Sequence, residues 1–187
     1  MMALLRESQE RLISGEELFR SPDIGPCELV DGRIVPLSPT RPEHGEVELD
    51  LGSELRAWAR SSGRGRALAG EVGLYIRRNP DTVRAADLIF ISHERYARWE
   101  SSTYLDVAPE LVVEVLSPTD RRSDVMEKIS DYFSVGVDRV WVVDSKLKCV
   151  LAYRAMTECQ QFKVGDVLAD EELLPGLRLS VADLFKV

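Results

Sequence analysis

Residues 109–144 decide the fold and read PELVVEVLSPTDRRSDVMEKISDYFSVGVDRVWVVD. Two aliphatic runs, 111–116 and 140–143, flank a helical segment that begins after Pro118 and ends at Gly136. Continuous apolar runs are typical of strands buried on both faces of a parallel sheet. The stretch therefore predicts a βαβ unit with a right-handed crossover.

Glu114 is the residue of the first run that does not suit a buried strand. An unpaired carboxylate in an apolar interior destabilises a fold strongly. We expect it to be paired, protonated or bound to a cation. That requirement makes Glu114 the first candidate for a functional residue.

The segment before residue 40 contains two local signals. Ser14-Gly15-Glu16-Glu17 is a capping box that opens a short helix through Phe19. Asp31-Gly32, between the runs 27–30 and 33–37, predicts a hairpin with a two-residue type I′ turn.

Apolar residues at spacings of three and four predict a helix from Glu43 to about Ser61, with one apolar face: Val47, Leu51, Leu55 and Trp58. Two strands, 67–77 and 83–91, are expected to follow, joined by the turn Asn79-Pro80-Asp81. A short helix is expected at 92–99. After Asp144, the runs 150–153, 161–164 and 166–168 predict an antiparallel meander, followed by a final strand and a closing helix at 181–185.

The pattern as a whole predicts an α/β (α+β) chain folded as a single domain, 1–187. We expect a core at about 42–144, an N-terminal hairpin at 26–38 and a C-terminal meander at 147–187.

Composition narrows the class of protein. No window of 18 apolar residues occurs, which predicts no membrane helix. The three cysteines fit neither a disulfide framework nor a metal ribbon, which favours a reducing cytoplasm. The net charge of -8 argues against a broad nucleic-acid surface but not against a local one formed by clustered arginines.

Three charged residues fall where this core can gather them: Asp87 at the start of one strand, Glu114 within the next, and Lys128 on the following helix. Two carboxylates suit Mg²⁺ or Mn²⁺, and a nearby ammonium can stabilise charge on a phosphate. These are the parts needed for metal-assisted phosphodiester hydrolysis. The alternatives without a catalytic role are a turn position for Asp87 and a surface ion pair between Lys128 and Asp124.

The chain resembles the restriction-endonuclease-like family, formerly a domain of unknown function, of the PD-(D/E)XK nuclease superfamily. The resemblance covers about residues 14–185 and is carried above all by 109–144. Shorter matching pieces are CELVDG at 27–32, SPTRPEH at 38–44, ADLIF at 86–90 and LPGL at 174–177. It implies a mixed central sheet flanked by helices, with an N-terminal hairpin and C-terminal antiparallel strands.

The resemblance also implies roles. Asp87 would be the acid of the PD step and Glu114 the acid of the (D/E)XK step, both binding the metal. A further ligand would come from the first core helix, where His44 ranks before Glu43, Glu46 and Glu48. Capping of that helix is the alternative role for His44.

This chain departs from the superfamily pattern. Ala86 stands where proline is usual, and Leu116 where the lysine belongs; Lys128 on the next helix is the expected substitute. Tyr132, one turn further, either positions Lys128 or a phosphate or packs in the core. Cys27 replaces an aromatic residue before Glu28, which is expected either to support the site or to pair with an arginine.

These features predict a Mg²⁺- or Mn²⁺-dependent DNA endonuclease, assembled as a homodimer by analogy with similar nucleases. Two alternatives stay open: a noncatalytic module that keeps the fold and binds nucleic acid or protein, and a phosphodiesterase acting on RNA or nucleotides.

Overall fold

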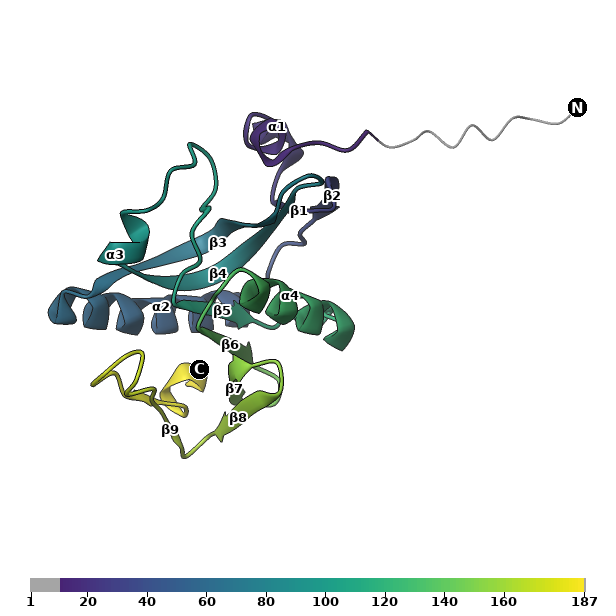
Figure 1. The fold of residues 1–187 in the computed structure, drawn as a ribbon. Helices are drawn as coiled ribbons and strands as arrows, with labels where there is room; N and C mark the ends of the chain where they lie inside the picture. The colour runs from purple at the N-terminus through teal and green to yellow at the C-terminus, as the bar shows by residue number, and fades with distance from the viewer. Residues whose placement is uncertain (1–10, 187) are drawn as a thin grey trace, which may run out of the picture.

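The computed structural model describes residues 11–186. Figure 1 shows a central sheet with the long helix α2 (Pro42–Ser62) running along β3 (Gly65–Arg77) and β4 (Thr82–Ser92), and with α4 (Arg122–Ser134) packed beside β5 (Leu111–Val115). Opposite faces of the sheet carry the two main core clusters, one with α2 and one with α4. This confirms the predicted mixed sheet flanked by helices.

The βαβ unit forms as the sequence predicts. β5 and β6 (Arg139–Asp144) are parallel neighbours, with Glu114 opposite Val142. All five residues of β5 are buried, because helices cover both faces of the sheet at this point. Glu114 is therefore an acid in a strand with no solvent-facing side.

The N-terminal signals also produce the predicted elements. Ser14 and Glu17 complete the capping box of α1 (Gly15–Phe19). β1 (Cys27–Val30) and β2 (Arg33–Pro36) pair in a hairpin, and the positive φ of Asp31 and Gly32 fits the type I′ turn. A 3₁₀ turn, Pro22–Ile24, separates α1 from the hairpin.

The sheet has eight strands in the order β2-β1-β4-β5-β6-β7-β8, with β3 paired to β4 off this path. Because β3 follows β4 along nearly its whole length, β1 and β5 must share the other edge of β4. β1 pairs there at Val83, and β5 pairs from Leu88 to Phe90. Residues 84–87 between them face a gap in the ladder.

The C-terminal part differs from the predicted meander. β7 (Cys149–Ala155) and β8 (Glu158–Lys163) extend the main sheet as antiparallel strands beyond β6. β9 (Val167–Leu168) instead pairs with β10 (Leu179–Ser180) in a separate two-stranded sheet. Leu168 and Leu179 are buried against the α2 side of the core, which draws this segment away from the sheet edge. Two further short helical elements are α3 (His93–Tyr96) and the 3₁₀ turn Asp183–Phe185.

Candidate active site

The candidate site lies at the gap in the β4 edge. The β4–β5 ladder ends with Leu88 opposite Val113, and the next residues along the two strands are Asp87 and Glu114. The Asp87 Oδ2 atom accepts a hydrogen bond from the backbone N–H of Val115 at 2.6 Å. A side chain therefore replaces the missing backbone pair, which fixes Asp87 beside the strand that carries Glu114.

Glu114 faces α4 and is 7% exposed. The hydroxyl of Tyr132 donates to its Oε1 at 2.5 Å, and Lys128 Nζ donates to its Oε2 at 3.0 Å. Burial raises the pKa of Glu114 to about 7; the Lys128 charge opposes the rise and the Asp87 charge adds to it. Glu114 is therefore paired, but the charge of Lys128 does not fully offset the cost of burying its carboxylate.

Lys128 is shared between two acids. Its Nζ lies 3.0 Å from Glu114 Oε2 and 3.0 Å from Glu28 Oε1. Burial works against the ammonium, but the charges of Glu114 and Glu28 together raise the pKa of Lys128. The lysine is therefore charged and fixed at the site, with these partners in place of the surface pair that its spacing from Asp124 would allow.

Glu28 connects the hairpin to this cluster. Its Oε1 accepts from the backbone N–H of Ala85 at 3.0 Å, and its Oε2 accepts from Arg84 Nη1 at 2.9 Å. The sequence left open whether Glu28 supports the site or pairs with an arginine, and it does both. Tyr132 likewise packs in the α4-side core and holds Glu114 rather than Lys128.

Sequence reasoning gave Arg84 no role, yet it ties the cluster to α4. Its guanidinium bonds Glu127 and Asp131 at 2.7 Å each, in addition to Glu28. The available signal was a charged residue within the predicted strand 83–91, the same kind of anomaly that marked Glu114.

His44 approaches Asp87 from the other side of the sheet. It is 6% exposed, and its Nε2 lies 3.5 Å from Asp87 Oδ2. The hydrogen bond to Asp87 raises the pKa of His44 against the effect of burial. Its Nδ1 is sealed from solvent without a hydrogen-bond partner among the described residues and lies 3.8 Å from Glu48 Oε2. No side chain caps α2, so His44 does not have the alternative capping role.

The other candidate metal ligands on α2 lie either beside His44 or in a neighbouring cleft. Glu48 lies near His44, and burial followed by the Asp87 charge raises the pKa of Glu48. Glu43 and Glu46 line a neighbouring cleft of about 650 Å³ that also reaches His44 and Leu116. The cleft has a mixed charge: basic side chains from Arg41, Lys146, Lys148 and Lys186, and acidic ones from Glu43, Glu46, Asp50, Asp120 and Asp144.

The donor atoms fit a divalent cation in their chemistry. Asp87 and Glu114 offer hard carboxylate oxygens, each with more than one lone pair, and His44 has an unpartnered buried nitrogen. Within residues 11–186, however, no three His, Cys, Asp or Glu side chains are already grouped so that they could hold a metal ion. Asp87 leans toward α2 while Glu114 leans toward α4.

Comparisons with known proteins agree with this architecture. The family model Uma2, described as "Putative restriction endonuclease", matches residues 16–182. A solved structure from Anabaena variabilis ATCC 29413, titled a "putative nuclease belonging to DUF820", has 21% sequence identity and a TM-score of 0.76. The alignment covers 92% of this chain and 97% of that chain, which shows a shared fold. No curated protein matches the chain.

Proposed function

The chain belongs to the Uma2 family, described as "Putative restriction endonuclease", and from that premise we propose that it is a metal-dependent endonuclease that hydrolyses phosphodiester bonds in DNA. The observation that carries the proposal is the buried Glu114, held by Lys128 and Tyr132 at the strand gap beside Asp87.

Asp87, Glu114 and His44 would hold Mg²⁺ or Mn²⁺, which when bound supplies an activated water and neutralises charge on the phosphate. The raised pKa of Glu114 supports this assignment, because a second cation beside it would relieve the cost of its buried charge. Asp87 is oriented for the role by the Val115 N–H.

Lys128 would stabilise the negative charge that develops on the phosphate. Its ammonium is fixed by Glu28 and Glu114 and keeps one-fifth of its side chain exposed, so a phosphate oxygen can approach it. A cation held at the point where negative charge develops stabilises the transition state of phosphoryl transfer.

The test is cleavage of single- and double-stranded DNA and RNA by the purified chain with Mg²⁺ or Mn²⁺. We expect DNA cleavage that falls by about 100-fold or more in Asp87→Ala, Glu114→Ala and Lys128→Ala. Glu127→Gln is the matched control, since this exposed acid touches Arg84 but not Glu114. Folded protein that cleaves no substrate, or variants that cleave as well as the parent, would overturn the proposal.

A second function is supported by a specific observation. Both oxygens of Glu114 already have partners, and the acids lean toward different helices. This favours a noncatalytic nuclease-fold module that binds nucleic acid or protein. Tight DNA binding without cleavage, unaffected by Glu114→Ala, would select this second function.

Assembly and location extend the proposal. We propose a single domain spanning 1–187 that forms a homodimer in the cytoplasm, by analogy with nucleases that cut two strands. In residues 11–186, no helix has the length and apolar character needed to cross a membrane.

A further inference from the structure

Arg84 is a buried arginine at the edge of the candidate site. It lies on β4, is 6% exposed, and donates to acids from two other elements. Its Nη1 bonds Glu28 Oε2 on β1 at 2.9 Å, and its Nε bonds Asp131 Oδ2 on α4 at 2.7 Å. Burial works against its charge, but Glu28 and Asp131 raise the pKa of Arg84, so the guanidinium stays ionised. Charged hydrogen bonds from one side chain therefore link the N-terminal hairpin, the central sheet and α4.

Glu28 is the acid through which Arg84 reaches the site. Its side chain is 3% exposed, and three donors fix its oxygens: Arg84 Nη1 on Oε2, and the Ala85 backbone N–H and Lys128 Nζ on Oε1, both at 3.0 Å. Removing one partner of a buried ion pair leaves an uncompensated charge, and Coulomb attraction draws that charge toward the nearest opposite one. For Glu28 that remaining charge is Lys128. Arg84 therefore keeps Glu28 from drawing the ammonium away from Glu114.

The second contact of Arg84 fixes the helix that carries Lys128. Asp131 is three residues after Lys128 on α4, so the two side chains lie on one side of the helix. Because Arg84 bonds Asp131, it sets the rotation of α4 against β4 at the turn from which Lys128 reaches the site. Arg84 also bonds Glu127, but this side chain is 60% exposed, where water can replace the contact at little cost. Glu28 and Asp131 are therefore the contacts that restrain Lys128.

We propose that Arg84 is a positioning residue for Lys128. By holding Glu28 and Asp131 together, it keeps the ammonium beside Glu114, where a phosphate oxygen can approach. This rests on the proposed endonuclease function, in which Lys128 stabilises the developing charge. A lysine side chain is long and flexible, so its ammonium acts at one point only where neighbouring groups restrain it. The alternative is a purely structural role for Arg84, and the two roles predict different kinetics.

The test is Arg84→Lys, which keeps the positive charge but lacks the planar fork that bonds two acids at once. We expect kcat for DNA cleavage to fall by about 10- to 100-fold, as is usual when a residue that orients a functional group is replaced. KM should stay within about twofold, because Arg84 is too buried to contact the DNA. Equal kcat in the parent and in Arg84→Lys, or a raised KM with kcat unchanged, would overturn the proposal.

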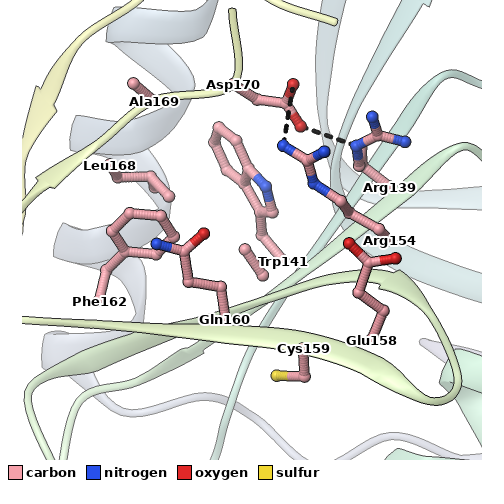
Figure 2. A pocket seen from close by; sticks show the side chains of 11 residues that line it. Arg139, Trp141, Arg154, Glu158, Cys159, Gln160, Phe162, Leu168, Ala169 and Asp170 are labelled. Carbon is pink, nitrogen blue, oxygen red and sulfur yellow. Dashed lines mark hydrogen bonds and ion pairs between the residues drawn. The ribbon is translucent and has the colours of Figure 1, made fainter. Parts of the chain in front are cut away.

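Arg139→Lys is the matched control. Arg139 is likewise shared between two acids: its Nε donates to Asp170 and its Nη2 to Glu172, both at 2.7 Å. Figure 2 shows its pair with Asp170, and the residue lies at the other end of the β5–β6 ladder from the candidate site. We expect this variant to lose stability as Arg84→Lys does but to cleave DNA at the parent rate. An equal loss of kcat in both variants would overturn the proposal, because lower stability alone would then explain it.

The restraint on the ammonium can also be measured without cleavage. An ammonium held by two carboxylates exchanges its protons with water more slowly than a free one, which makes it visible in heteronuclear NMR spectra of lysine ammonium groups. We expect a Lys128 signal, assigned by its loss in Lys128→Arg, in the parent and in Arg139→Lys but not in Arg84→Lys. No such signal in the parent, or one that persists in Arg84→Lys, would overturn the proposal. A parent that gives the expected spectra but cleaves no substrate would overturn the endonuclease function and leave the positioning by Arg84 standing.

Asp131→Asn keeps the proposal testable if Arg84→Lys fails to fold. This acid is 24% exposed, and the change keeps the size of the side chain while removing the charge that Arg84 Nε meets. We expect a smaller loss of kcat, about fivefold, and a weaker Lys128 signal, since Glu28 still holds Arg84. Glu127→Gln, at the exposed acid bonded by the same guanidinium, should match the parent in both measurements. If Asp131→Asn matches the parent as well, Arg84 does not act through α4 and the proposal fails.

Discussion

Two clusters of buried acid and base lie in this sheet and differ in their balance of charge. At Asp170, Arg139 and Arg154 face a buried acid, and although burial opposes it, the hydrogen bond from Arg139 lowers the pKa of Asp170. At Glu114, one lysine is shared with Glu28, Asp87 lies nearby, and the pKa of Glu114 is raised to about 7.

The difference separates a structural ion pair from a candidate functional one. A buried acid with a structural role has enough positive charge beside it to stay ionised at little cost in stability. Glu114 has too little positive charge beside it, as expected of a site that binds a cation during its function. Replacing each acid by its amide therefore tests the comparison directly.

The largest expected effect on stability is in Asp170→Asn. This change leaves Arg139 partly unpaired in a buried place, and we expect a loss of about 3 kcal/mol in the free energy of unfolding. For a chain of this size the melting temperature should fall by roughly 6–12 °C. Glu114→Gln should show little loss at pH 8, because it removes a costly buried charge. A larger loss in Glu114→Gln than in Asp170→Asn would break the comparison.

The pH dependence of stability gives a second test of the comparison between Glu114 and Asp170. The pKa of Glu114 is about 7 in the fold against an ordinary value of 4.5, so between these pH values the native state binds more protons than the unfolded state. Stability should therefore decrease as pH rises from about 4.5 to about 7, by up to about 3 kcal/mol. Denaturant unfolding in EDTA measures this, with Glu114→Gln as the reference. The same slope in both proteins would remove Glu114 as its source.

The smallest expected effect is stabilisation by Mn²⁺. At a concentration tenfold above its dissociation constant, an ion bound only by the native state adds about 1.4 kcal/mol. Thermal unfolding at pH 8 should show this rise in the parent and in Asp170→Asn, but not in Asp87→Asn or Glu114→Gln. A rise of equal size in all four proteins would place the ion elsewhere.

Much of the fold follows from local patterns. The Asp31-Gly32 turn, the capping box at Ser14 and the apolar face of 43–61 all form the elements they predict. These signals depend on neighbours within a few residues, so they can be read without tertiary contacts. The placing of β9 was wrong for the opposite reason: its partner β10 lies beyond an intervening loop, and no local pattern selects it.

By itself, the sequence determined that an acid would be buried in the strand 111–116 and that Asp87 and Lys128 would lie on adjoining elements. Only the tertiary structure decided how they meet. The shared edge of β4 opens a gap between β1 and β5, into which Glu28 and Arg84 bring contacts that span 43 to 100 residues of chain. Strand order and register create those contacts, and both are set by packing of the whole sheet rather than by any one stretch of residues.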